Sequence, residues 1–74
     1  MTRPFDELTK ALGKPVMLRL KGDRTIRGVL ASFDVHLNII LENAEELANG
    51  QEQGIKEKYP RLMVRGDNII FVAL

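Results

Sequence analysis

The stretch "RGVLASFDVHLNIIL", residues 27–41, decides how this chain folds. Its first half has the composition of a strand, yet it carries Gly28 in its interior, where a glycine usually marks a bend or a bulge. A polar turn follows, and alternation then resumes, with Leu37, Ile39 and Leu41 expected on one face. The stretch therefore predicts two consecutive strands, the first of them strongly bent.

On the N-terminal side, the sequence predicts a short helix over about residues 3–12. Pro4 suits the first turn of a helix, and Gly13 is placed for a left-handed stop. The apolar residues of this segment form one narrow stripe: Phe5, Leu8 and Leu12. A stripe of that width does not support an independent helix, so we expect the helix to lie on another surface of the protein.

The remaining strands are indicated by alternation and by the turns between them. Residues 15–20 alternate apolar and polar side chains, and "KGDR" at residues 21–24 is expected to form a hairpin with the next strand. A polar loop is expected over about residues 48–57, before two closing strands, "YPRLMVR" and "NIIFVAL". One helix and five short strands predict a mainly β fold, a small and nearly closed antiparallel barrel.

The small size of the chain and its last strand both favour self-association. A single core in a chain of 74 residues supplies no more than roughly 3 to 5 kcal/mol, so such domains add disulfides, metals or partner subunits. The sequence has no cysteine and one histidine, which excludes disulfides and a zinc cluster. The final strand is apolar on both faces. We expect the last two strands to present edges that pair head to tail between subunits and close a ring.

Hydropathy and charge limit the cellular locations and the binding partners to be expected for this chain. The first residues contain no hydrophobic segment of a signal peptide, and no stretch approaches the ~18 apolar residues of a membrane span. We therefore expect a cytoplasmic protein without a membrane partner. The net charge is only +1, but residues 1–30 and 55–74 are basic and residues 31–54 are acidic. This segregation predicts either a basic face for phosphates or ordinary solvated faces.

Two segments of the chain resemble the two motifs of Sm-like proteins. "RGVLASFDVHLNIIL" is similar to the first motif: a glycine, a hydrophobic residue two positions on, an aspartate, and an apolar-asparagine pair four residues later. "VRGDNIIFV", residues 64–72, is similar to the second, an apolar residue followed by Arg-Gly and an apolar strand. With the helix and the loop, the resemblance covers the whole chain, and it is to the archaeal type of Sm-like protein.

The resemblance implies a single Sm domain over residues 1–74, with the first motif over about residues 13–47 and the second over about residues 58–74. It implies a short helix followed by a strongly bent five-stranded antiparallel barrel of the SH3-like type, assembled into a ring that usually has seven subunits. It further implies binding of uridine-rich single-stranded RNA at the pore, in a scaffold or chaperone role in RNA processing or metabolism. Neither a cofactor nor a DNA partner is implied.

The chemistry of three residues supports a base-binding site. A single-stranded base offers two π-faces and an unpaired edge, so a protein that binds it needs planar groups and an amide. We expect His36 and Arg65 to stack on the two faces of the base. Asn38 lies two residues after His36 and should point the same way in an extended segment. Its amide can donate to a uracil carbonyl and accept from the N3–H of the base.

An amide that rotates freely also pairs with cytosine, so another group must fix its orientation. Asp34 and Asp67 are the candidates, because each ionised carboxylate accepts hydrogen bonds from the Asn38 amide or from the Arg65 guanidinium. Gly66 fits a tight turn. The predicted RNA-binding residues are thus His36, Asn38, Arg65 and Asp67, with Asp34 and Gly66 in supporting positions.

Other interpretations of the same residues stay open. His36 is also consistent with an exposed turn residue, Asn38 with a residue that stabilises the turn, and Arg65-Gly66-Asp67 with an ordinary turn between strands. An SH3-like barrel that binds proteins is the main alternative function, although the chain has no Trp, one Tyr and three Phe to line such a groove. An enzyme is disfavoured, because no Ser-His or paired-carboxylate spacing is present.

Overall fold

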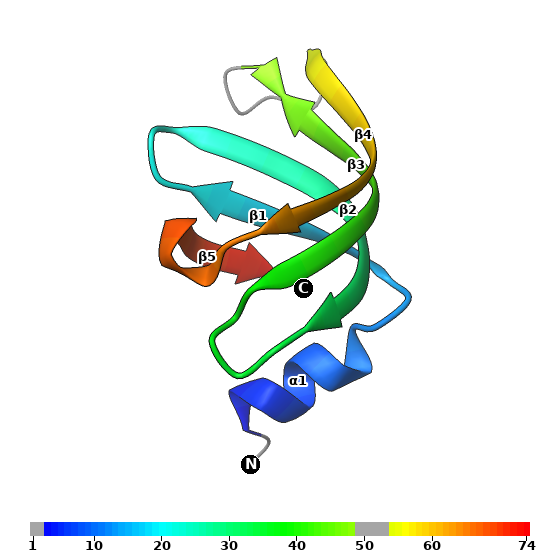
Figure 1. Ribbon diagram of the computed structural model, residues 1–74, viewed down its shortest axis with the longest axis vertical. Coiled ribbons are helices and arrows are strands. Elements are labelled where there is room, and N and C mark those ends of the chain that lie inside the picture. The colour runs from blue at the N-terminus through cyan, green and yellow to red at the C-terminus, as the bar shows by residue number, and fades with distance from the viewer. Residues whose placement is uncertain (1–2, 49–53) are drawn as a thin grey trace.

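The computed structural model describes residues 3–48 and 54–74 and confirms the predicted fold class. The elements in chain order are α1 (Pro4–Lys10), β1 (Pro15–Leu20), β2 (Arg24–Phe33), β3 (Ile39–Leu47), β4 (Ile55–Val64), the 3-10 turn η2 (Gly66–Asn68) and β5 (Ile69–Ala73). The five antiparallel strands form one sheet in the order β4-β3-β2-β1-β5, which is strongly bent, with α1 at one end (Figure 1). No helix within the described ranges is long and apolar enough to cross a membrane. Of the loop expected over residues 48–57, residues 49–53 lie outside the described residues and residues 55–57 lie in β4.

The hairpin of β1 and β2 forms where the alternation predicted it. Val16, Leu18 and Leu20 are all buried in the core, and each pairs with a residue of β2 across the antiparallel ladder. The turn between the strands contains two consecutive left-handed residues, Gly22 with φ of 80° and Asp23 with φ of 62°. Glycine and aspartate are among the residues that adopt this conformation at least cost, so the turn sequence suits the geometry.

The bend predicted at Gly28 is present, and β3 is responsible for it. A Cβ atom on Gly28 would lie 3.1 Å from the Ala44 Cα and 3.1 Å from the Glu42 carbonyl oxygen. The register between β2 and β3 shifts at this point, between Arg27 and Val29. β3 has one residue more than β2 at this bulge. Asn43 lies in the bulged segment and has a φ of 51°. Gly28 is therefore needed because two backbones approach closely, which lets the sheet fold over on itself.

The helix packs on the barrel by the expected face, but that face ends earlier than predicted. Leu8 and Ala11 are buried, and the Phe5 ring meets the Phe33 ring edge to face with 5.0 Å between the ring centroids. Leu12 was expected in this stripe, but α1 ends at Lys10 and Leu12 is 42% exposed. The prediction for Leu12 is wrong because the chain has already left the helix at that residue.

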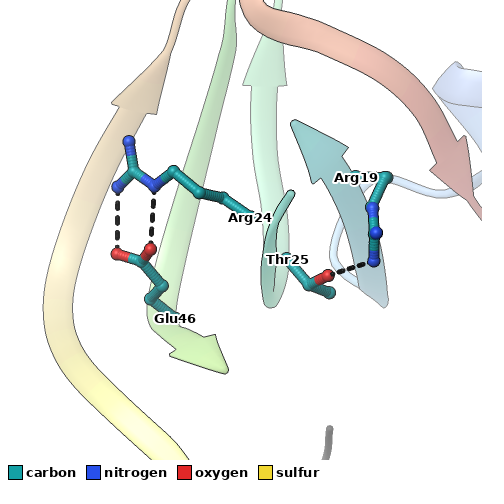
Figure 2. Close-up of polar contacts among 4 residues, drawn as sticks. All are labelled: Arg19, Arg24, Thr25 and Glu46. Atoms are coloured by element: carbon teal, nitrogen blue, oxygen red, sulfur yellow. Dashed lines mark hydrogen bonds and ion pairs between the residues drawn. The ribbon is translucent and has the colours of Figure 1, made fainter. Parts of the chain in front are cut away.

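Two polar side chains are buried among the described residues, Thr25 and Glu46, and both have cationic partners (Figure 2). Glu46 accepts from Nε and Nη2 of Arg24 at 2.8 and 2.9 Å, and Thr25 Oγ1 accepts from Nη1 of Arg19 at 3.1 Å. The bidentate hydrogen bond to Arg24 lowers the pKa of Glu46. These contacts fix the register of β1, β2 and β3, since a slipped strand would leave a buried carboxylate without a partner.

The two edges of the sheet are β4 and β5, and both carry exposed apolar side chains. Met63 on β4 is 63% exposed, and Ile70 and Phe71 on β5 are 60% and 51% exposed. Ile70 is also the extra residue where the register between β1 and β5 shifts. Large apolar side chains on both unpaired edges mark these strands as surfaces for association.

Candidate nucleic-acid interface

The loop between β2 and β3 is a tight turn of five residues, 34–38. The Leu37 N–H donates to the Asp34 carbonyl at 3.0 Å, and the Asp34 N–H donates to the Asn38 carbonyl at 3.2 Å. Leu37 has a φ of 61°, a conformation that costs a residue with a Cβ roughly 1–2 kcal/mol. Leu37 was expected to share a strand face with Ile39 and Leu41, and that prediction is wrong, since this residue closes the turn and is 42% exposed.

The same turn sets the directions of the His36 and Asn38 side chains. Their side chains were expected to point the same way because they lie two residues apart in an extended segment. The segment is not extended, since β3 begins only at Ile39. Their relative direction is set by the turn and by the contacts of Asp34, and not by strand alternation.

The carboxylate of Asp34 organises this turn. Its Oδ1 accepts from the backbone N–H groups of His36 at 2.9 Å and Asn38 at 3.0 Å, and its Oδ2 accepts from Nδ2 of Asn38 at 3.0 Å. The hydrogen bond from the Asn38 side chain, followed by that from the Asn38 backbone, lowers the pKa of Asp34. At neutral pH the group is therefore ionised and accepts hydrogen bonds only.

The second loop, between β4 and β5, is joined to the first through Gly66. The Gly66 N–H donates to Oδ1 of Asn38 at 2.9 Å. A Cβ atom on Gly66 would lie 2.1 Å from the His36 carbonyl oxygen and 2.9 Å from that of Leu37. Gly66 is thus required because the two loops touch through their backbones at this residue, which brings Arg65 next to the His36 turn.

The two predicted carboxylates have different partners. Asp34 holds Asn38, whereas Oδ2 of Asp67 lies 3.7 Å from Nη2 of Arg65. Both side chains of the second pair are well exposed, and an exposed ion pair stabilises by only about 0–1 kcal/mol. Arg65 is therefore held loosely and its planar face is accessible to a ligand. The side chain of His36 is exposed as well.

The predicted turn between β1 and β2 lies beside the loop between β4 and β5, and no sequence signal indicated that contact. The backbone N–H of Lys21, in the turn between β1 and β2, donates to the Asn68 carbonyl at 2.9 Å. The close approach of Gly66 was also missed, because it depends on a contact between segments far apart in the sequence. The left-handed Leu37 was missed because alternation assigned this residue to a strand. Across residues 3–48 and 54–74, no cluster of three His, Cys, Asp or Glu side chains could hold a metal ion.

A comparison with known families identifies the domain that this chain contains. The model of the LSM domain matches residues 6–74. The chain belongs to the LSM domain family. The predicted resemblance to Sm-like proteins is thereby confirmed, and both sequence motifs lie within the matched LSM domain.

Individual LSM relatives match over nearly the full length of both chains. An snRNP Sm-like relative from Methanosarcina acetivorans is 45% identical over 71 residues, which are 96% of this chain and 94% of the relative. The Sm protein of Pyrococcus abyssii, solved in complex with a uridine heptamer, superposes with a TM-score of 0.89 at 33% identity and covers 97% of each chain. A heptameric archaeal Sm protein superposes with a TM-score of 0.81 at 38% identity, over 92% of this chain and 94% of that one.

Proposed function

We propose that this LSM protein binds uridine-rich single-stranded RNA as a ring of identical subunits, most simply of seven. The observation that carries the proposal is the fixed amide of Asn38, held between Asp34 and Gly66 on a turn that also carries His36. The similar protein of Pyrococcus abyssii was solved with a uridine heptamer, and another similar archaeal Sm protein is heptameric. Both similarities support the proposal for this chain.

The Asn38 amide keeps one N–H and one oxygen lone pair for a ligand after its two contacts within the protein. A group that donates and accepts side by side matches the C4 carbonyl and the N3–H of uracil. His36 and Arg65 lie on adjoining loops and are exposed, so they can stack on the two faces of the same base. Asp67 lies beside Arg65 and completes the site, where its carboxylate forms an exposed ion pair with the guanidinium.

Assembly into a ring follows from the two apolar edges. Pairing β4 of one subunit with β5 of the next gives hydrogen-bond partners to both strand edges, and no edge stays unpaired once the ring closes. A cleft of about 250 Å³ opens beside β4, and its lining includes the polar residues Lys21, Arg24, Arg65 and Asn68 as well as apolar ones. The residues that contribute apolar surface to it are Leu20, Ile26, Tyr59, Leu62, Met63 and Val64. A neighbouring subunit can fill this cleft with side chains from its own β5 edge.

The ring places one base-binding site per subunit around a common opening, so a single RNA strand can contact several sites at once. Such an assembly suits a scaffold or chaperone in RNA processing, without catalysis by the chain itself. A cytoplasmic location, and the boundaries of the single Sm domain over residues 1–74, remain part of this proposal. A protein-binding barrel is the alternative, and it requires no preference among bases.

Fluorescence anisotropy with labelled ten-nucleotide homopolymers tests the proposal. Oligouridine should bind more tightly than oligocytidine or oligoadenosine. His36→Ala and Arg65→Ala should weaken binding of every homopolymer, because stacking on a side chain contributes ~1 to 3 kcal/mol per base. Lys14→Ala, a change of one exposed cation on the α1 side of the fold, serves as the control for loss of charge. Equal affinity for all homopolymers, unaffected by these substitutions, would contradict the proposed function.

A further inference from the structure

The free edge of β4 is longer than the strand that is proposed to pair with it. β4 has ten residues, and β5 has five. A short strand can slide along a uniform longer edge in steps of two residues, because each such step keeps the same side chains on the same face. A ring in which every subunit pairs alike therefore needs a feature that selects one position on β4.

Pro60 divides β4 near its middle. The residues on either side of it pair with Glu42 and Ala44 of β3, so Pro60 lies opposite the bulged residue Asn43, and Figure 1 shows β4 curving strongly around the barrel. Proline offers no backbone N–H to a neighbouring strand, so within sheets it occurs at edges and bulges. A straight partner strand meets both a residue without a donor and a change of direction at this point.

The side chains on the two halves of β4 also differ. The first half carries three consecutive exposed charged residues, 56–58. The second half is apolar over residues 62–64, and Met63 is 63% exposed. Because β5 is apolar throughout residues 69–73, pairing it with the first half would cover charged groups with apolar ones, which is unfavourable. Charged side chains and proline are also the features by which natural sheets block pairing along an edge.

We propose that Pro60 fixes the register between subunits: β5 of the neighbouring copy pairs with residues 61–64 of β4, and the pairing ends at Pro60. Residues 55–59 then form no ladder with the neighbour. This inference rests on the proposed assembly into a ring. The segment 61–64 is close in length to β5, so it leaves no room for a slipped position. A single register makes every contact between subunits identical, as a closed ring requires.

Introduced cysteines show which half of β4 lies beside β5, because the chain has no cysteine of its own. One variant combines Met63→Cys with Ile70→Cys, and the other combines Lys58→Cys with Ile70→Cys. The two β4 positions are up to about 16 Å apart along the strand, at ~3.3 Å per residue, so a short bismaleimide distinguishes them. On denaturing gels we expect linked multimers from the Met63 variant. The Lys58 variant should show no more linkage than Ile70→Cys alone.

Pro60→Val tests the role of the proline itself, because valine restores a backbone N–H and suits an extended strand. Pro15→Val is the matched control, since Pro15 begins β1 and pairs with Val29 of β2, away from the β4 edge. Native mass spectrometry should show one assembly for the wild type and for Pro15→Val, and several for Pro60→Val. Added to the variant with Lys58→Cys and Ile70→Cys, Pro60→Val should also produce the linkage that is otherwise absent.

The possible failures are distinguishable. Linkage through Lys58→Cys with Pro60 in place, or a ring without linkage through Met63→Cys, would overturn the proposed register and leave the ring intact. A Pro60→Val protein with one assembly and no linkage at position 58 would overturn the role of the proline. The first comparison keeps Pro60, so it decides on the register even if Pro60→Val does not fold. A wild-type protein that stays monomeric at micromolar concentration would overturn the proposed ring, and this inference with it.

Discussion

Replacing Gly66 by alanine tests the junction of the two loops. The new Cβ atom would lie 2.1 Å from the His36 carbonyl oxygen, which is a backbone atom and cannot move aside as a side chain would. The loops must separate, and the hydrogen bond from the Gly66 N–H to Asn38 at 2.9 Å must lengthen or break. The substitution should therefore destabilise the fold and also release the Asn38 amide.

The magnitude follows from these two contacts. Overpacking of this kind costs roughly 1–3 kcal/mol, and the lost hydrogen bond adds roughly 0.5–1.5 kcal/mol, so we expect a loss of about 2–4 kcal/mol per subunit. Urea unfolding at a fixed protomer concentration measures it, since stability of an assembly depends on concentration. With a slope of roughly 1–3 kcal/mol per molar urea, the midpoint should fall by about 1 M or more.

Gly22→Ala is the control for the change from glycine to alanine. Gly22 has a φ of 80° and open space around its Cβ position, so only conformational strain of about 1 kcal/mol is expected. The control should keep the wild-type preference for oligouridine, and Gly66→Ala should lose most of it. A Gly66→Ala protein with wild-type stability and wild-type preference would refute the argument that the loops meet at this residue.

The other predictions concern assembly, stacking and pH. Ile70→Glu places a charge on the exposed β5 edge and should dissociate the ring, as native mass spectrometry would show; an intact ring would contradict pairing through β5. His36→Ala and Arg65→Ala should weaken RNA binding. The affinity of the wild type should fall only modestly as salt is raised, since the site contacts bases more than phosphates and ~0.7 counterions are released per neutralised phosphate. A steep fall of affinity with salt in titrations would argue against base stacking. Hydrogen bonds lower the pKa of Asp34 and of Glu46 in the folded protein. The two carboxylates therefore stabilise the fold at pH values above their unfolded pKa of about 4, and this stabilisation is lost as the pH falls through their lower folded pKa values. Urea midpoints between pH 7 and pH 2 should show this loss, less steeply in Glu46→Gln, and an identical pH profile in that variant would exclude the Glu46 contribution.

Local patterns predicted the elements well because each element depends on neighbours in the sequence. The alternation of Val16, Leu18 and Leu20 became a buried strand face, "KGDR" became a hairpin turn, and Gly28 marked the bend. Where the prediction failed, a tertiary contact was responsible. Leu12 continues the helical period but lies beyond α1, because the chain there turns toward β2, where the Gly13 N–H donates to the Leu30 carbonyl at 2.8 Å.

In the candidate site, too, the sequence indicated residues but not the contacts between loops. The resemblance to the Sm motifs, supported by the need of a base for planar groups and an amide, indicated His36, Asn38 and Arg65. The sequence could not choose between Asp34 and Asp67 as the partner of Asn38, because that choice depends on how a turn at residues 34–38 meets another at residues 65–68. It also could not predict the left-handed Leu37, since alternation alone assigned this residue to the strand.

The central claim is that the Asn38 amide recognises the N3–H of uracil, and a modified base tests it most directly. Competition binding should compare ten-nucleotide RNAs made of uridine, 3-methyluridine and 5-methyluridine. Methylation at N3 removes the N–H that would donate to the Asn38 amide oxygen, whereas methylation at C5 leaves the N3–H and the C4 carbonyl in place. We predict that the 5-methyl RNA competes as uridine does and that the 3-methyl RNA is weaker by about tenfold or more, the effect of one hydrogen bond. Equal competition by the uridine and 3-methyluridine RNAs would contradict the account.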